Sequence, residues 1–281
     1  MTKITSLVEA RKQFASQEAC EKHLAAMRWP NGVTCPRCGS KTVTYMESRH
    51  QWQCECRYQF SVTSGTVFHK THMDLPRWLM AIWLVCHSPK GISSKQIQRE
   101  LGVTYKTAWY MTRRIRIAMQ NANFGMKLGG IVEADTTMVQ AAQGKRKAGW
   151  RHDGQDVLGI VSRDGVLRLE VVKDLSSNEV MRVFAKHVGL VRQIFTDEAP
   201  YFLNTYRFAP HQTVKHADHY AIGRIHINHV ENAWSLFKRG LTGVYHFVSS
   251  RYLQEYLDEF AFRGSHRNER EAMVSLVLAA C

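Results

Sequence analysis

The sequence contains no long hydrophobic run and few acidic residues. Its longest strongly apolar stretch covers only residues 78–86, whereas a membrane-spanning helix needs roughly 20 apolar residues. The first 24 residues mix acidic and basic side chains and lack the apolar centre of a signal peptide. We therefore expect a cytoplasmic protein without membrane contact, whose cysteines stay reduced and form no disulfide framework.

Acidic side chains are outnumbered by basic ones. The 281 residues include 24 Asp and Glu against 38 Lys and Arg, a formal net charge of +14. This excess favours a polyanionic partner, most simply double-stranded DNA, although a basic enzyme without such a partner is the alternative. Hydrophobic residues make up 44% of the chain, which is ordinary for a globular protein, and the length is typical of about two domains.

Internal repeats and low-complexity tracts are also absent, but the character of the sequence changes several times. The pattern predicts a multidomain α/β (α+β) protein. Its expected parts are an N-terminal helical segment (1–27), a cysteine-rich segment of short strands (28–70), a helical segment (71–121), a glycine-containing linker (122–130) and a mixed α/β domain (131–281).

Four of the seven cysteines form two close pairs, Cys35/Cys38 and Cys54/Cys56. Zinc takes four tetrahedral ligands, which two cysteine turns supply when a hairpin brings them together. The second pair is tighter than the usual two-residue spacing, so His50 is a further candidate ligand. We predict a zinc ribbon over 28–70 that depends on its metal for much of its stability.

The helical segment predicts two helices separated by a glycine. Ser93 or Ser94 is expected to cap the first helix, Gly102 to end it and Thr104 to cap the second. The expected inward positions are Ile97, Leu101, Ala108, Met111 and Ile115, and the expected outward ones are Lys106, Arg113, Arg114 and Arg116. This pattern is typical of a helix-turn-helix, whose second helix enters a major groove. A structural hairpin with a solvated basic face is the alternative.

Two apolar runs in the second half of the chain end in an aspartate, Asp135 and Asp197. Both runs are predicted strands, and a hairpin with an Asp164-Gly165 turn is expected between them. A helix predicted over 228–239 carries Asn228, Glu231 and Lys238 on one stripe. Two strand-end aspartates and a helix glutamate suit a pair of Mg²⁺ ions in phosphoryl transfer.

Several motifs, in order, resemble the zinc-ribbon group of insertion-sequence transposases (the ISXO-like group, related to Merlin elements). They include the first cysteine pair, Leu101-Gly-Val-Thr-Tyr-Lys-Thr-Ala-Trp, Val132-Glu-Ala-Asp and His226-Ile-Asn-His-Val-Glu-Asn-Ala-Trp. The resemblance implies an RNase H-like domain with a DDE-type active site. It assigns Asp135, Asp197 and Glu231 to the catalytic metal ligands for Mg²⁺ or Mn²⁺, with Asn228 as a rival for the third position. Lys238 falls where these enzymes carry a basic residue for DNA.

The resemblance further implies a protein that binds terminal inverted repeats as at least a dimer and catalyses strand cleavage and strand transfer. The expected DNA contacts are Lys106, Arg113, Arg114, Lys145, Arg146, Lys147, Lys238 and Arg239. In the family, Glu commonly follows the first Asp, whereas Thr136 stands here. A catalytically silent DNA-binding regulator and a plain RNase H-type nuclease are the alternatives.

The sequence leaves the function of two groups of residues near the candidate ligands undecided. Glu133 and Glu198 adjoin the aspartates and could support them. Five histidines could form a second zinc site, although we favour residues that flank the catalytic groove. They are His211, His216, His219, His226 and His229.

Overall fold

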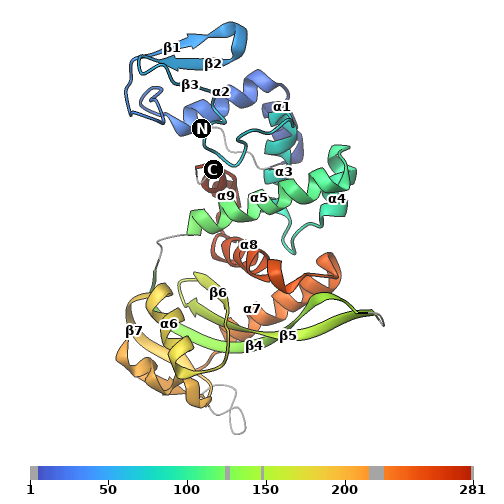
Figure 1. The fold of residues 1–281 in the computed structure, drawn as a ribbon. Coiled ribbons are helices and arrows are strands. Elements are labelled where there is room, and N and C mark those ends of the chain that lie inside the picture. Colours follow the sequence, from blue (N-terminus) through green and yellow to red (C-terminus); the bar gives the residue numbers. More distant parts are fainter. Residues whose placement is uncertain (1–5, 124–126, 147–148, 215–224, 280–281) are drawn as a thin grey trace. The chain divides into compact units, whose positions relative to one another are not determined.

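The computed structural model describes residues 6–123, 127–146, 149–214 and 225–279 (Figure 1). Two compact units make up this part of the chain. Unit 1 comprises Met1–Ser88, Ser94–Ala122 and Glu269–Cys281, and unit 2 comprises Pro89–Ser93 and Asn123–Asn268. Residues 269–281, which the sequence division placed with 131–281, count with unit 1. The finer five-part division stays a prediction.

Helices form most of unit 1. They are α1 (Leu7–Gln13), α2 (Gln17–Arg28), α3 (Leu75–His87), α4 (Ser94–Leu101), α5 (Tyr105–Asn123) and α9 (Arg270–Ala279). The central helix is α3, which contacts α1, α2, α4 and α9 and fully buries Trp78, Leu79 and Ile82. This explains why residues 78–86 are so apolar: the helix is covered on several sides.

A small antiparallel sheet lies between α2 and α3 in the sequence. Its strands β1 (Val43–Met46), β2 (Gln51–Cys54) and β3 (Gln59–Phe60) are in that order, with one 3₁₀ turn, η1 (Glu47–Arg49), between the first two. The rings of Trp29, Trp52 and Phe60 lie within 6.0 Å of one another and form its apolar face. A sheet this small buries little else, which agrees with the predicted dependence of this segment on a metal.

Unit 2 is built on a five-stranded sheet with the order β6-β5-β4-β7-β8. The strands are β4 (Leu128–Arg146), β5 (Gly149–Ser162), β6 (Leu167–Val171), β7 (Val188–Thr196) and β8 (His211–Thr213). The first three run antiparallel to one another, whereas β7 is parallel to β4 and β8 to β7. Three antiparallel strands followed by two parallel ones are the arrangement of an RNase H-like domain. The predicted multidomain fold class is confirmed.

Helices cover both faces of this sheet. Successive residues of each strand point to opposite faces, so each strand contributes side chains to both cores. The even-numbered Val132, Ala134 and Ile194 pack with α6 (Ser177–His187) and the 3₁₀ segment η2 (Pro200–Arg207). Phe195 and Val157 pack on the opposite face with α7 (Asn228–Gly240) and α8 (Leu253–Ser265). A π-helical turn η3 (Leu241–Tyr245) and a 3₁₀ turn η4 (Ser250–Tyr252) link these two helices. Residues 133 and 135 of β4 lie on the same face of the sheet as Phe195 of β7, because Glu133 pairs with Phe195 and alternate residues of a strand share a face. This is the face that α7 covers.

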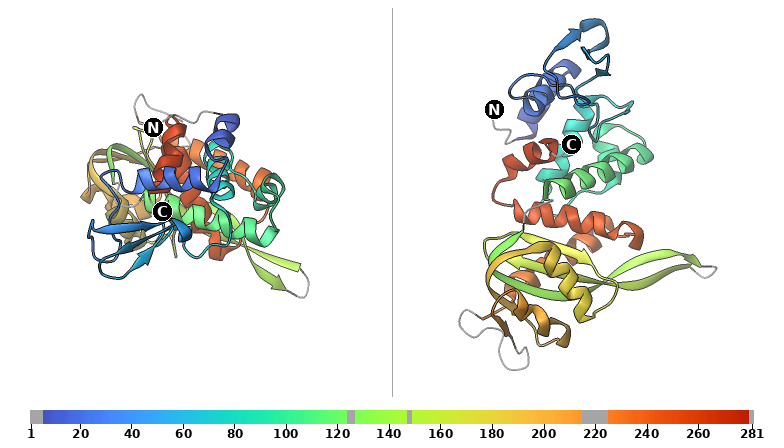
Figure 2. Two further views of the ribbon diagram at one scale, coloured as in Figure 1. Left: turned by 90° about the horizontal axis from the view of Figure 1, so that it is seen from above. Right: turned by 60° about the vertical axis from the view of Figure 1, so that its left-hand side comes forward.

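Two features of unit 2 bear on the predicted hairpins. The Asp164-Gly165 turn joins β5 to β6, with Gly165 at φ +96°. From the sequence alone, the basic run 145–152 is expected to be a loop; the residues of it that the structure describes, 145–146 and 149–152, instead continue the pairing of β4 with β5 as far as Arg146 and Gly149. That expectation was wrong, because backbone pairing extends along both strands past the sheet, as the projecting hairpin in Figure 2 shows. No helix within the described ranges is both long and apolar enough to cross a membrane.

Candidate active site and metal centre

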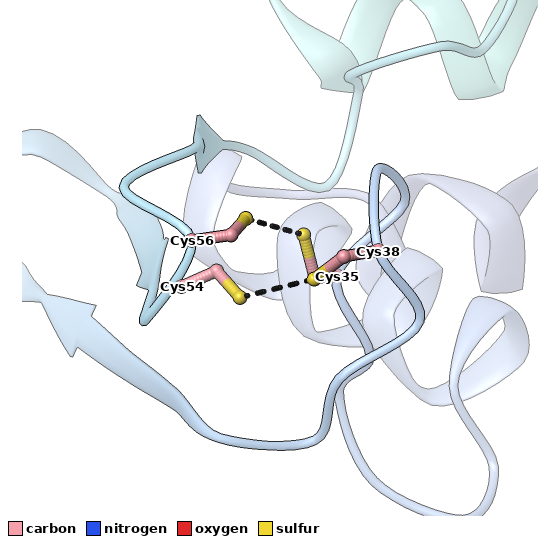
Figure 3. A group of neighbouring side chains, drawn as sticks. All are labelled: Cys35, Cys38, Cys54 and Cys56. Carbon is pink, nitrogen blue, oxygen red and sulfur yellow. Dashed lines mark hydrogen bonds between the residues drawn. The ribbon is translucent and has the colours of Figure 1, made fainter.

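The four paired cysteines of unit 1 converge at one end of the small sheet (Figure 3). Cys35 and Cys38 come from the loop before β1, Cys54 is the last residue of β2, and Cys56 lies in the turn after it. Gly39 (φ +74°) and Arg57 (φ +64°) take left-handed conformations that tighten the two turns. The backbone supports them too, since Gly39 N donates to Cys35 O and Arg57 N to Cys54 O.

The sulfur positions fit a tetrahedral zinc ion. The Sγ atoms of Cys35 and Cys56 are 3.8 Å apart, those of Cys38 and Cys54 are 3.5 Å apart, and all four lie within 4.8 Å of one another. A Zn–S distance of about 2.3 Å gives sulfur–sulfur separations of about 3.8 Å in a tetrahedron. The short Cys54/Cys56 turn therefore places both of its sulfurs where they could bind a shared zinc ion.

The protein also favours a thiolate at Cys35. Desolvation raises the pKa of this thiol, but the backbone N–H groups of Cys38 and Arg37 outweigh it and lower the pKa from 9.0 to about 7. His50, the alternative ligand, lies outside the group, since its Nδ1 is 3.5 Å from Glu21 Oε2. The expectation that it could replace a cysteine is wrong.

Helices α4 and α5 are joined by the tight turn predicted for a helix-turn-helix. Gly102 has φ +62° and ends α4, and the Thr104 hydroxyl accepts a hydrogen bond from Thr107 N at 3.2 Å. Ser94 is the first residue of α4, and its hydroxyl lies 2.9 Å from Thr112 Oγ1. All predicted inward positions are fully buried except Leu101, which is half-buried.

The basic residues of α5 divide into two groups. Lys106 is exposed and Arg113 is half-buried. Arg116 is only 2% exposed, so the expectation that it faces outward was wrong; it shares a stripe with the buried Thr112 and Met119, on a helix covered on more than one face. Arg114 donates to the carbonyls of Val67 and His69, and we leave it out of the DNA contacts proposed below.

In unit 2, two parallel strands bring Asp135 and Asp197 together. Strands β4 and β7 are neighbours, with Glu133 paired to Phe195. Asp135 and Asp197 each follow this pair by two residues, and the charge of Asp197 acts on the Asp135 carboxylate. Asp197 follows the last residue of β7, and its Oδ1 accepts a hydrogen bond from Ala199 N at 3.1 Å.

Helix α7 lies along β4 and meets three of its alternate residues. Glu133 accepts a hydrogen bond from His229 N at 2.8 Å, Asp135 Oδ2 accepts one from Trp234 Nε1 at 3.1 Å, and Thr137 Oγ1 accepts one from Lys238 Nζ at 2.6 Å. Two strand residues advance about 6.7 Å and four to five helical residues about 6 to 7.5 Å. We call these contacts the β4–α7 ladder; the matched spacings align the helix with the strand that carries Asp135.

The space for this ladder depends on Gly159, which pairs with Asp135 from β5. A Cβ at this position would lie 2.5 Å from Cζ2 of Trp234, closer than side chains tolerate. The missing side chain lets the indole reach the carboxylate.

Charge gathers around Asp135. Its pKa is raised from 3.8 to about 6: burial is the largest cause, the charges of Asp197 and Glu231 also raise the pKa, and the hydrogen bonds from Thr136 N and Trp234 lower it. Three carboxylates therefore share one region of unit 2. Of the two rivals for the third position, Glu231 acts electrostatically on Asp135, whereas Asn228 is exposed at the first residue of α7.

Thr136, which stands where related sequences carry Glu, points elsewhere. Its Oγ1 lies 2.7 Å from the hydroxyl of Tyr201, and the pKa of that hydroxyl is raised, mainly by desolvation and also by Asp197 and Asp135. Tyr201 therefore links η2 to the strand beside the carboxylates.

Glu133 is a buried anionic centre behind these carboxylates. Its side chain is fully buried and lies 3.1 Å from Arg163 Nε, 3.2 Å from His226 Nδ1 and 2.8 Å from His229 Nδ1. The three acidic and histidine side chains are close enough together to hold a metal. Because the Arg163 guanidinium occupies the same carboxylate oxygen, we assign the group to holding the start of α7 in place.

The other histidines do not join this group in the described part of the chain. His211 Nε2 lies 2.8 Å from Thr196 Oγ1 on β7, and His216 and His219 lie outside the described residues. Glu198 is exposed next to Asp197.

The structure describes some of the remaining predicted DNA contacts, and others lie outside the described residues. Lys238 and Arg239 are exposed in the last turn of α7. Lys145 and Arg146 are in the projecting part of β4, and Lys147 lies outside the described residues. All of these assignments stay predictions.

Sequence reasoning missed the supporting residues Trp234, Gly159 and Arg163. Trp234 reads as a core position of α7, and it is indeed buried. Its offset of three residues from Glu231 was a usable signal, because residues three apart are neighbours on a helix surface. For Gly159 and Arg163 the single sequence offers no such signal.

Comparisons with known proteins agree with this arrangement. A family model of the ISXO2-like transposase domain matches residues 127–264, and one of the transposase zinc-ribbon domain matches residues 15–59. A relative described as "Uncharacterized protein in transposable element ISH50", from Halobacterium salinarum, is 28% identical over 279 residues, which cover 90% of this chain and 92% of the relative.

Among solved structures, the catalytic core domain of BIV integrase matches 53% of this chain and 80% of its own, with 13% identity and a TM-score of 0.24, too distant to support an argument. The family matches stand without it, since they fall in the same order as the zinc ribbon and the carboxylate-bearing sheet. The chain belongs to the ISXO2-like, zinc-ribbon group of DDE-type insertion-sequence transposases.

Proposed function

We propose that this transposase binds the terminal inverted repeats of its element through unit 1 and cleaves and joins DNA strands in unit 2. The observation that carries the catalytic part is the convergence of Asp135, Asp197 and Glu231: the charges of Asp197 and Glu231 both act on the half-buried Asp135. Like charges this close are stable when a cation lies between them.

The donor set fits Mg²⁺ or Mn²⁺. Both are hard cations that prefer carboxylate oxygens, and the three candidate ligands offer only such atoms. Two bound ions supply the stabilisation of the attacking and leaving oxygens in phosphoryl transfer. We propose that Asp135, Asp197 and Glu231 would hold these ions.

The chain's own residues orient these ligands. Trp234 Nε1 and Thr136 N, at 3.1 and 2.7 Å, donate to the two oxygens of Asp135 and fix its plane. Ala199 N holds one oxygen of Asp197. Lys238, exposed and hydrogen-bonded to Thr137, can neutralise a DNA phosphate at the edge of the site. Such positioning is most of what a protein contributes to phosphoryl transfer.

Unit 1 has the parts that DNA recognition needs. A zinc-stabilised ribbon precedes two helices joined by a tight turn, and Lys106 and Arg113 are on the second of these helices. We propose that this helix lies in a major groove, with the basic side chains on phosphates. The net charge of +14 supports a strong electrostatic component of binding. We propose that at least two copies act together on DNA in the cytoplasm.

The direct test uses the full-length, zinc-loaded protein and donor DNA that flanks the gene. With Mg²⁺ or Mn²⁺ we expect cleavage at the element ends followed by strand transfer into a target plasmid. Asp135→Asn is expected to abolish both and to leave end binding intact. Cleavage by that variant at the wild-type rate would refute the assignment.

The same assay separates the rival readings. A silent regulator binds the ends but never cuts them, and a plain nuclease cuts without joining and without preference for the ends. For the third ligand, Glu231→Gln is expected to stop cleavage, whereas Asn228→Ala keeps it. The opposite result assigns the position to Asn228.

A further inference from the structure

A pocket in unit 1 lies next to the first turns of α5. It has a volume of about 350 Å³ and is lined by residues of the loop 70–73, by α3 and by α5. Ligand pockets run from roughly 300 to 1,000 Å³, so this one holds a single ring system and no larger group.

The lining combines aromatic and apolar walls with basic side chains. Trp78, Tyr110, Met73 and Met111 provide the walls, and the exposed Lys70 and Lys106 are basic. A nucleotide has the matching chemistry, because its base is a flat ring that stacks on aromatic side chains and its phosphates are anionic.

The pocket is preformed, because the loop that closes it is tied to the helices. Thr71 Oγ1 accepts hydrogen bonds from Trp78 Nε1 at 2.9 Å and from Met73 N at 3.1 Å. Arg114 donates to the carbonyls of Val67 and His69, just before the loop, and its guanidinium lies 4.8 Å from the Tyr110 ring. This is the role that we assign to Arg114 in place of a phosphate contact.

We propose that this pocket binds one unpaired nucleotide of a DNA strand, with its base against Tyr110 and its phosphates on Lys70 and Lys106. A stacked base pair presents only its edges to a helix in the groove, so a base must leave the duplex or belong to a single-stranded tail to enter. The inference rests on the proposed DNA binding by unit 1 and adds recognition of strand ends or distorted DNA to it.

The test compares two DNA probes with the full-length, zinc-loaded protein in the absence of Mg²⁺ and Mn²⁺. One probe is a blunt duplex, and the other is the same duplex with a short single-stranded thymidine tail. Fluorescence anisotropy is expected to show about tenfold tighter binding of the tailed duplex, as stacking of one base on an aromatic ring supplies.

Two variants then locate the preference. Tyr110→Ala removes the stacking wall and Met73→Trp fills the pocket; each is expected to abolish the preference for the tail and to leave the affinity for the blunt duplex unchanged. The matched control is Tyr105→Ala, since Tyr105 is also exposed on α5 but does not line the pocket, and it is expected to keep the preference. Thermal unfolding verifies that each variant is folded.

Each outcome decides between the claims. Binding of the blunt duplex without any preference for the tail overturns the pocket assignment and leaves the proposed function standing. A preference that persists in both pocket variants also overturns the assignment, because the tail then binds elsewhere. Failure to bind either probe overturns both.

Discussion

The indole Nε1 of Trp234 donates a hydrogen bond of 3.1 Å to Oδ2 of Asp135, across 99 residues of sequence. The contact joins a helix to the strand that carries the first candidate metal ligand. Since Thr136 N occupies the other oxygen, the carboxylate has one defined orientation.

Replacing Trp234 with Phe is expected to slow DNA cleavage at least about tenfold, because hydrogen bonds to charged groups are worth about 1.5–3 kcal/mol. DNA binding should not change. Single-turnover cleavage and anisotropy measure the two quantities. Phe237→Leu, a change to a buried residue of the same helix, is the control and should cleave near the wild-type rate. Equal rates in both variants would mean that the indole does not position Asp135.

Gly159→Ala is expected to destabilise unit 2 and to reduce cleavage. The new Cβ would lie 2.5 Å from Trp234 Cζ2 and 3.1 Å from Leu169 Cδ2, and overpacking of a core costs about 1–3 kcal/mol. Thermal unfolding measures the loss. The control is Gly243→Ala, where an added Cβ meets no atom within 4 Å. A Gly159→Ala variant as stable and active as this control contradicts the packing argument.

Removing the fully buried Glu133 carboxylate is expected to lower the free energy of unfolding by about 1–3 kcal/mol, because the half-buried Arg163 loses this 3.1 Å ion pair. His229 N also loses its acceptor at the start of α7. Urea denaturation of Glu133→Ala tests this. Glu198→Ala removes an exposed carboxylate nearby and should change stability by no more than about 0.5 kcal/mol. Similar midpoints for the two variants would exclude the anchoring role of Glu133.

Substitution of Cys38 by Ser is expected to abolish zinc binding and to unfold the small sheet, because each of the four sulfurs is a ligand in the proposed site. Cys38 is exposed, so the change leaves core packing intact. Zinc content of the purified protein is the measurement. Cys20→Ala, at a cysteine outside the cluster, should retain the metal. Full zinc content in Cys38→Ser would remove this residue from the ligand set.

The stability of unit 2 should depend on pH through Asp135. The folded pKa of about 6 exceeds the unperturbed value of 3.8, so the folded state binds this proton more tightly. Without divalent cations, this group's contribution therefore falls as pH rises from about 4 to about 6. Burial likewise raises the pKa of Asp258 to about 6, so the comparison must be with Asp135→Asn, which removes only one of the two contributions.

Mn²⁺ should reverse this loss by replacing the proton. Ligands bind metals when deprotonated, and a metal at about 100 times its dissociation constant stabilises the folded state by about 2.7 kcal/mol. The increase in melting temperature is expected to be larger above pH 6 than below it and to be absent in Asp135→Asn. A pH-independent increase, or one that the variant keeps, would show that the metal binds elsewhere.

Sequence patterns correctly predicted those helix ends and strands that depend on residues close together in the chain. Gly102 and Thr104 shape the turn between α4 and α5 as expected, since a cap and a left-handed residue are decided within a few positions. The two apolar runs before Asp135 and Asp197 form neighbouring strands for the same reason, since their apolar pattern is local. The prediction that the first strand ends at Asp135 was wrong, because pairing with β5 continues β4 to Arg146.

The features that the sequence did not predict depend on packing between residues far apart in the chain. The burial of Arg116 follows from how many sides of α5 are covered, and the supporting roles of Trp234 and Gly159 arise only when β5 and α7 meet β4. The pairing of residues 144–146 with residues 149–151 also depends on a partner strand, and basic side chains alone gave no indication of it.

The β4–α7 ladder has a consequence for synthesis of the protein. A nascent or truncated chain that ends before residue 228 contains both strand aspartates but neither Glu231 nor the indole that orients Asp135. The proposed nuclease activity thus requires roughly the last fifth of the polypeptide to have emerged and docked, so prematurely terminated products should be harmless to the host chromosome.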